Sequence, residues 1–119
     1  MSAEEDVFSR LNPSWKLWLE YDDEYVFGPG AYAILKSIQE EGTITAGAKA
    51  LGMSYRYAWG VVRKIEQTLG VKLLETFKGG IEGGGGARIT DFGTRLMALF
   101  ASFQESFEQV SRKDGRRRS

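Results

Sequence analysis

The sequence contains no histidine, no cysteine and no apolar run long enough to cross a bilayer. Without imidazole or thiol groups, it has no Ser-His pair, no cysteine nucleophile and no thiolate or imidazole metal site. Enzymes that work through carboxylates or lysine stay open. The chain does not start with a basic-then-apolar signal, so we expect a cytoplasmic protein without disulfides.

The sequence also lacks a net charge, because 16 Lys and Arg residues balance 16 Asp and Glu residues. The charges are unevenly spread. Residues 1–27 hold two basic and seven acidic groups, whereas residues 54–119 hold twelve basic and seven acidic ones. The two ends therefore have opposite polarity, which the summed charge conceals. With 119 residues and 42% apolar side chains, the chain is expected to form one globular domain.

The first third of the sequence predicts a hairpin and a helix. Residues 1–12 are polar and acidic, and we expect them to be a flexible end. The stretch "WKLWLEY", Trp15 to Tyr21, alternates apolar and polar residues like a half-buried strand, and Asp22-Asp23-Glu24 turns it into a partner strand over 25–27. Apolar residues at helical spacing from Ala31 then predict a helix that ends at Gly42.

The middle of the sequence predicts a helix-turn-helix. In "TITAGAKALG" a threonine cap precedes a short helix of small residues, which lets a neighbour pack close, and Gly52 ends it. Ser54 is expected to cap the next helix, "YRYAWGVVRKIEQTL", which ends at Gly70. Two helices joined by a short glycine-containing turn form the helix-turn-helix unit. The fold class that follows is mainly α, with some β.

A long-looped hairpin and a last helix complete the pattern. "VKLLETF" and "ARIT" read as strands on either side of the glycine-rich segment, and Thr90 or Asp91 opens the final helix. The run "GGGG" is not followed by Gly-Lys-Ser/Thr and leads into a strand, so a nucleotide cradle is disfavoured. Beside a helix-turn-helix the hairpin becomes a wing, with Lys78 and Arg88 on its arms placed to meet phosphates. A solvated tip without function is the alternative.

The helix over 55–69 has two different sides when its residues are placed 100° apart. The inner side holds Ala58, Val62, Ile65 and Leu69, flanked by Tyr55 and Trp59. The outer side is basic, aromatic and hydrogen-bonding; its members are Arg56, Tyr57, Gly60, Lys64 and Gln67, with Arg63 at the border. Such a surface suits the DNA major groove, where Arg and Lys meet guanine acceptors. The alternative is an ordinary solvated helix surface.

The last helix carries an apolar stripe broader than a small core needs: Phe92, Leu96, Leu99, Phe100, Phe103, Phe107 and Val110. We expect it to pair with a second copy, although completion of the core is the alternative. The basic end "RKDGRRRS" is either a non-specific phosphate contact or a solvated tail. Asp22, Asp23 and Glu24 lack the spacing of a Ca²⁺ loop and are interpreted as a turn.

Together, "GMSYRYAW", "GGGGARIT" and "FG" resemble the N-terminal winged helix of ModE-type molybdate-responsive transcription regulators and, more distantly, the LysR-type DNA-binding domain. The similarity covers roughly residues 27–105. It implies a dimer paired through its first and last helices, with Ser54, Tyr55, Arg56, Tyr57 and Lys64 facing DNA and Lys78 and Arg88 on the wing. Full-length regulators of this type carry C-terminal oxyanion-binding domains; this chain ends at Ser119, and no molybdate site is expected in it.

The sequence therefore predicts a flexible end over 1–12, a winged helix-turn-helix DNA-binding domain over 13–112 and a basic tail over 113–119. The expected function is a homodimeric, sequence-specific regulator of transcription that binds double-stranded DNA without a cofactor, metal ion or membrane. The alternatives are an architectural protein with little sequence discrimination and a protein-binding winged helix with residues 1–27 as its surface. An enzyme is the least favoured. The full set of expected DNA contacts is Thr43, Thr45, Ser54, Tyr55, Arg56, Tyr57, Gly60, Arg63, Lys64, Lys78 and Arg88.

Overall fold

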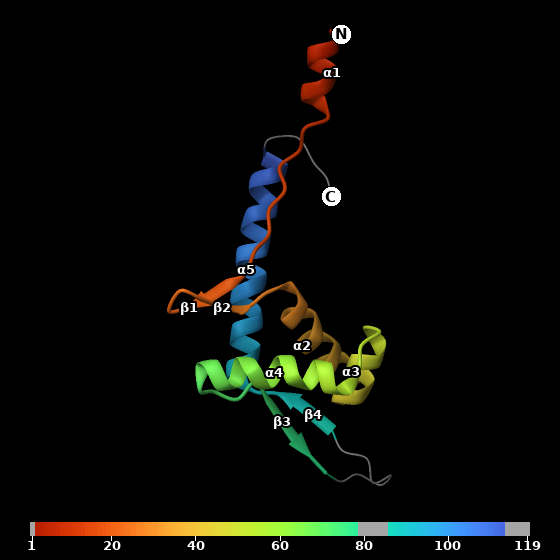
Figure 1. The fold of residues 1–119 in the computed structure, drawn as a ribbon, viewed down its shortest axis with the longest axis vertical. Helices are drawn as coiled ribbons and strands as arrows, with labels where there is room; N and C mark the ends of the chain where they lie inside the picture. Colours follow the sequence, from red (N-terminus) through yellow and green to blue (C-terminus); the bar gives the residue numbers. More distant parts are fainter. Residues whose placement is uncertain (1, 79–85, 114–119) are drawn as a thin grey trace.

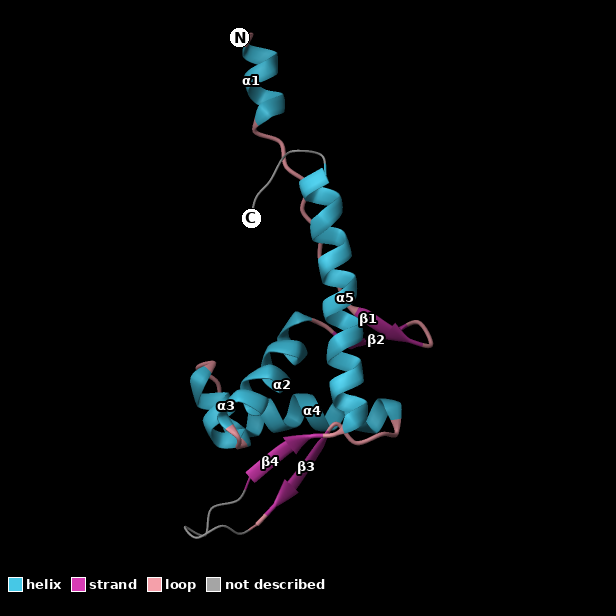
Figure 2. Ribbon diagram, turned by 180° about the vertical axis from the view of Figure 1, so that it is seen from behind, coloured by secondary structure: helices cyan, strands magenta, loops and turns pink. Residues whose placement is uncertain are grey.

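The computed structural model describes residues 2–78 and 86–113. Its elements in chain order are α1 (Ala3–Ser9), β1 (Leu19–Tyr21), β2 (Glu24–Phe27), α2 (Pro29–Glu41), α3 (Ile44–Ala50), α4 (Tyr55–Leu69), β3 (Leu74–Phe77), β4 (Gly86–Ile89) and α5 (Asp91–Lys113). Helices α2, α3 and α4 form a cluster from which the β3–β4 hairpin extends on one side and α5 on the other (Figures 1 and 2). The mainly α winged helix-turn-helix is confirmed.

The predicted capping residues fix the ends of the helix-turn-helix. Helix α2 ends at Gly42, whose φ of 88° lies in the left-handed region that glycine adopts without strain. The Thr43 hydroxyl accepts a hydrogen bond from the Ala46 amide, and the Ser54 hydroxyl accepts one from the Tyr57 amide, both at 3.0 Å. Each hydroxyl satisfies an amide at the start of a helix that would otherwise lack a partner.

Helices α2 and α3 are in backbone contact, as the small residues of α3 predicted. A Cβ atom on Gly47 would lie 2.9 Å from the Ile38 backbone, so only glycine fits there without a shift. Nearby, the buried Ser37 hydroxyl donates to the Gly47 carbonyl at 2.8 Å. This contact holds α3 against α2, and α4 packs against both helices.

The hydrophobic core lies where α2, α4, β2 and the first half of α5 meet, and it includes Phe27, Leu35, Ile38 and Leu73, none of which exposes any measurable area. Phe100 of α5 is also part of this core. Its ring lies edge-on to Phe27 at 5.5 Å between centroids and 5.6 Å from Tyr32, and it is 3% exposed. The expectation that Phe100 belongs to an exposed pairing surface is therefore wrong, because its own chain buries the ring.

The first hairpin is shorter than the sequence predicted. Asp22 and Asp23 both have positive φ, at 50° and 68°, which is the backbone of a tight two-residue turn. The strand begins at Leu19 instead of Trp15, because β2 has only four residues and offers the earlier residues no partner. Trp15 packs instead against Phe107 of α5, with ring centroids 6.2 Å apart, so the segment before β1 follows α5 (Figure 1).

The N-terminal residues, whose polar and acidic composition predicted a flexible end, contain the helix α1. The Ser2 hydroxyl accepts from the Glu5 amide at 3.1 Å, and the Glu5 carboxylate accepts from the Ser2 amide at 3.3 Å. This reciprocal cap, together with the Asp6–Arg10 ion pair, stabilises α1 locally. The local signal for this helix is the Ser-x-x-Glu motif formed by Ser2 and Glu5, which is typical of a capping box. No residue of α1 is buried.

The β3–β4 hairpin, here called the wing, pairs antiparallel from Leu74↔Ile89 to Phe77↔Gly86. The amide of Ala87 donates to the carbonyl of Gly42 at 2.9 Å, which ties β4 to the end of α2. The expected polyglycine tip over 79–85 and the end of the basic tail over 114–119 lie outside the described residues. In the part of the chain that is described, no helix has the length and apolarity to cross a membrane.

Substituting Gly47→Ala should lower the free energy of unfolding by about 1–3 kcal/mol, because the added methyl group forces α2 and α3 apart. The matched control is Gly60→Ala on α4, where a Cβ atom meets nothing within 4 Å. That change should raise stability by about 0.5–1 kcal/mol through helix propensity. Urea unfolding followed by circular dichroism measures both. Equal midpoints for the two variants would contradict the close contact.

Candidate nucleic-acid interface

Helix α4 has one buried side and one exposed side, as its periodicity predicted. Ala58, Val62 and Ile65 are at most 4% exposed, and Leu69 is half-buried. On the opposite side Arg56, Gly60, Arg63, Lys64 and Gln67 are all exposed. The helix ends at Gly70, which has a φ of 72°. The exposed side is therefore free to meet a partner along the full length of the helix.

The exposed side of α4 carries positive charge without a matching negative charge. Among the described residues, no carboxylate forms an ion pair with Arg56, Arg63 or Lys64. Arg63 instead lies over the Trp59 ring, with its guanidinium carbon 5.6 Å from the ring centroid. The one acidic residue of α4, Glu66, is buried. This side of α4 is accordingly a cationic surface suited to an anion.

A groove of about 710 Å³ separates α4 from the wing. It brings together residues from the start of α3, the start of α4 and the wing strands; they are Thr43, Ile44, Thr45, Tyr55, Trp59, Thr76, Phe77, Lys78 and Gly86. Four expected DNA contacts, Thr43, Thr45, Tyr55 and Lys78, thus lie in one groove. Thr43 and Ser54 use their hydroxyls as helix caps, so their side chains are already hydrogen-bonded to their own helices.

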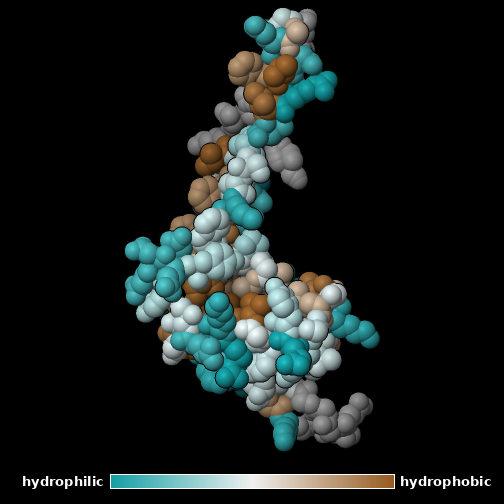
Figure 3. Space-filling model, viewed as in Figure 1, coloured by the Kyte–Doolittle hydropathy of each residue, from teal (hydrophilic) through white to brown (hydrophobic). Residues whose placement is uncertain are grey.

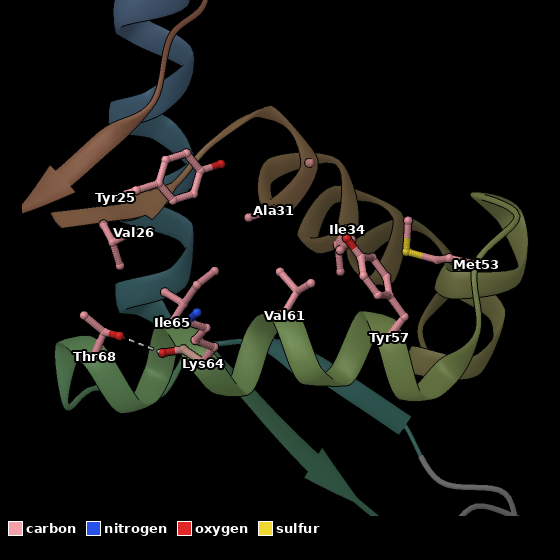
Figure 4. Close-up of a pocket in the computed structure, with 11 residues that line it drawn as sticks. Tyr25, Val26, Ala31, Ile34, Met53, Tyr57, Val61, Lys64, Ile65 and Thr68 are labelled. Atoms are coloured by element: carbon pink, nitrogen blue, oxygen red, sulfur yellow. Dashed lines mark hydrogen bonds between the residues drawn. The ribbon is translucent and has the colours of Figure 1, made fainter.

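Two other expected contacts lie on the opposite flank of α4. Tyr57 and Lys64 line a separate cleft of about 410 Å³ beneath the β1–β2 hairpin and beside α2 (Figure 4). They remain on the exposed surface of α4 but are directed away from the wing. The exposed side of α4 consequently has two neighbours: the wing groove on one flank and this cleft on the other.

Arg88 is not brought into the wing groove. It lies opposite Glu75 across the hairpin, and its Nη2 atom is 3.3 Å from the Glu75 Oε1 atom. Its guanidinium also lies over the Phe77 ring, at 5.7 Å from the centroid. Both side chains of the ion pair are more than half exposed. Because Glu75 balances its charge, Arg88 offers an anion less attraction than Lys78, for which the described residues supply no ion pair.

Glu66 is a residue of this site that was not among those predicted from the sequence. Its Oε2 atom accepts hydrogen bonds from the amides of Leu73 and Leu74, at 2.7 and 3.1 Å, and the residue is 7% exposed. These bonds join α4 to the first residue of β3 and so position the wing beside the helix. A signal existed: on the helical projection Glu66 falls between Val62 and Trp59, on the inner half of the helix.

Part of the apolar stripe that was predicted to pair two copies is exposed on α5. Leu99, Phe103, Phe107 and Val110 are 44–66% exposed and share one side of the helix. Phe92 and Leu96, nearer the helix start, are half-buried against the core. The stripe is therefore divided: its first part completes the core, and its second part stays exposed.

A family model for bacterial regulatory helix-turn-helix proteins of the LysR family matches residues 30–94, which is more than half of the chain. The chain belongs to this family. The matched residues run from α2 through the wing into α5, so they include both the exposed side of α4 and the groove. Family membership of this kind indicates a regulatory protein and not an enzyme.

Relatives of the ModE type are similar over most of the chain. The transcriptional regulator ModE of Yersinia pestis is 38% identical over 84 residues, covering 71% of this chain and 32% of that protein. The DNA-binding transcriptional dual regulator ModE of Escherichia coli K12 is 34% identical over 102 residues, covering 82% and 38%. The resemblance seen in the sequence is confirmed. The chain spans about a third of the length of these relatives.

Solved structures share the fold of this family member. The structure described as a complex of the CbnR DNA-binding domain with DNA superposes with a TM-score of 0.53 at 23% identity, covering 73% of this chain and 97% of that chain. ArgP of Mycobacterium tuberculosis gives a TM-score of 0.52 at 21% identity, covering 72% and 30%. At these identities the likeness establishes the fold alone.

Replacing Glu66 by alanine should lower the free energy of unfolding by about 2–4 kcal/mol, since two buried amides lose their acceptor. Glu66→Gln keeps an acceptor oxygen and should cost less. Amide hydrogen exchange at Leu73 and Leu74 measures the local effect alongside urea unfolding. If Glu66→Ala left both exchange rates unchanged, the carboxylate would not be what joins the wing to α4.

Proposed function

We propose that this chain binds double-stranded DNA with sequence specificity, as a homodimer, and thereby regulates transcription. The observation that carries the proposal is the exposed side of α4, where Arg56, Arg63 and Lys64 have no carboxylate partner among the described residues and Gly60 leaves the backbone open. Membership of a regulatory helix-turn-helix family and the names of the ModE relatives support it.

In this proposal α4 enters the major groove. The groove admits one helix, and Arg or Lys donates to the acceptors of guanine, so Arg56, Arg63 and Lys64 are the candidates for reading bases. Tyr55 and Tyr57, exposed at the first turn, are placed to contact thymine methyl groups or sugars. Gly60 lets the helix backbone approach the base edges because no side chain stands between them.

The wing contacts the DNA backbone in this proposal. Lys78 lies in the groove between the wing and α4, together with Thr43 and Thr45 at the start of α3. A cation beside two hydroxyl-bearing residues suits a phosphate, and such contacts give affinity without reading sequence. Arg88 contributes less, because Glu75 already balances its charge.

The exposed part of the α5 stripe supports the homodimer. Leu99, Phe103, Phe107 and Val110 form an apolar strip that stays 44–66% exposed in a single copy, although Trp15 of the same chain lies against Phe107. Pairing two copies along α5 buries it and relates two α4 helices by a two-fold axis. Such a dimer reads two half-sites about 34–36 Å apart, and hence a near-palindromic sequence.

A salt titration of DNA binding separates the roles of α4 and the wing. Lys78→Ala should weaken binding to every duplex and reduce the slope of log K against log salt by about 0.9. Arg88→Ala should have a smaller effect on both. The double variant Arg56→Ala/Lys64→Ala should instead reduce the difference in affinity between a selected site and random DNA.

Fluorescence anisotropy with the full chain measures these values, on a site obtained by selection from a random duplex pool. Lys49→Ala, at the end of α3, removes a cation outside the proposed interface and is the matched control. Equal affinity of the native chain for all duplexes would favour an architectural role over specific regulation. No binding at low salt would refute the proposal.

Introducing a charge on the α5 stripe should separate the two copies. Phe103→Glu places a carboxylate within the apolar contact and should shift the protein from dimer to monomer at micromolar concentration. Ala101→Glu, also exposed but 200° away around the helix, is the matched control and should stay dimeric. Sedimentation equilibrium gives the mass. A native chain that is already monomeric would contradict the pairing.

A further inference from the structure

The cleft beneath the β1–β2 hairpin has an apolar floor. Val26 from β2, Ala31 and Ile34 from α2, and Ile65 from α4 form it, each 2–8% exposed. Its volume is about 410 Å³, within the range of about 300–1,000 Å³ that small-molecule sites have. Figure 3 shows apolar surface in the hollow between the hairpin and α4, bordered by more polar residues. The cleft is thus a concave apolar surface open to solvent.

The rim of this cleft is polar and carries one positive charge, that of Lys64. Tyr25 and Tyr57 stand at its edges, 62% and 61% exposed, and Lys64 and Thr68 complete the edge formed by α4 (Figure 4). The Thr68 hydroxyl donates to the Lys64 carbonyl at 3.0 Å, which leaves its oxygen able to accept a hydrogen bond. Within the described residues, no carboxylate lies in ion-pair contact with the Lys64 ammonium group.

The chemistry of the cleft selects its occupant. The apolar floor favours a hydrophobic body, and two tyrosine rings give it flat walls. The unpaired ammonium group favours a single negative charge and disfavours a cation. A DNA phosphate would satisfy Lys64 but leave the apolar floor in water. We propose that this cleft binds a small molecule with an aromatic or aliphatic body and one anionic group, the anionic group against Lys64 and the body over the floor.

This proposal has a regulatory consequence that rests on the proposed function. Tyr57 and Lys64 belong both to the cleft and to the surface of α4 offered to DNA. A molecule held in the cleft engages both side chains, so it competes with DNA for them. Occupation of the cleft should therefore weaken DNA binding, whereas ligand binding itself needs no DNA.

The probe pair is 8-anilinonaphthalene-1-sulfonate and its neutral counterpart N-phenyl-1-naphthylamine, which lacks the sulfonate. Both fluoresce when their rings leave water. The full chain should bind the sulfonate saturably, one molecule per chain. Lys64→Gln should weaken sulfonate binding about three- to tenfold and leave the neutral probe unchanged, as expected for loss of one partly exposed charged contact.

A second variant tests the floor independently of charge. Gly30 lines the cleft, and a Cβ atom there would meet nothing within 4 Å, so Gly30→Leu fills the space without a clash at its own backbone. It should abolish binding of both probes. Lys49→Gln, which removes a cation outside the cleft, should bind both probes like the native chain. Circular dichroism and a cooperative urea transition establish that each variant is folded.

The outcomes are separable. Loss of sulfonate binding in Gly30→Leu, together with a three- to tenfold weakening of sulfonate binding in Lys64→Gln, supports the site. If Gly30→Leu and Lys64→Gln bind the sulfonate as tightly as the native chain, or if binding does not saturate, the site is refuted. If the sulfonate binds as expected while the chain does not bind DNA in anisotropy measurements, the proposed DNA-binding function is refuted and the ligand site in the cleft is still supported. If DNA binds and the saturating sulfonate leaves its affinity unchanged, the competition is refuted.

Discussion

The bond between the Glu66 carboxylate and the amides of Leu73 and Leu74 determines how the wing stands beside α4. A hairpin of four-residue strands has little stability alone and needs a fixed support. Glu66 supplies it from within α4, and the Ala87–Gly42 backbone bond supplies a second attachment at the end of α2. Tyr55 and Lys78 line opposite sides of the groove between α4 and the wing, so the two attachments help to hold those sides together.

The same residue shapes the charge of the surface. Helix α4 contains one acidic side chain, and that side chain is turned inward. The Glu66 carboxylate therefore accepts hydrogen bonds from the backbone at the start of β3 and does not neutralise Arg56 and Arg63 on the exposed side of α4. On the wing the opposite arrangement holds, since Glu75 is exposed and pairs with Arg88. The position of each carboxylate, more than the number of cations, decides where an anion is attracted.

Much of the fold could be predicted because it depends on local signals. Threonine and serine caps, glycines at the helix ends and the 3.6-residue period predicted the ends and the buried sides of α2, α3 and α4. The predictions that were wrong concern contacts between residues far apart in sequence. The Phe100 ring contacts the Phe27 ring, and the Trp15 ring contacts the Phe107 ring. The periodicity of the sequence predicts neither contact. The α1 helix is different, because its Ser2–Glu5 cap is a local signal that the sequence contains.

The candidate site, too, was predictable where it depends on local periodicity and not where it depends on contacts between distant residues. That Arg56, Gly60 and Lys64 share an exposed side of α4 follows from the helical angle alone. Which flank each residue faces depends on neighbours that periodicity does not contain, namely the wing on one side and the β1–β2 hairpin on the other. Tyr57 and Lys64 therefore belong to two surfaces at once. A side chain shared in this way couples the two surfaces directly, because it cannot make both contacts in full, and no conformational change is needed to transmit the effect.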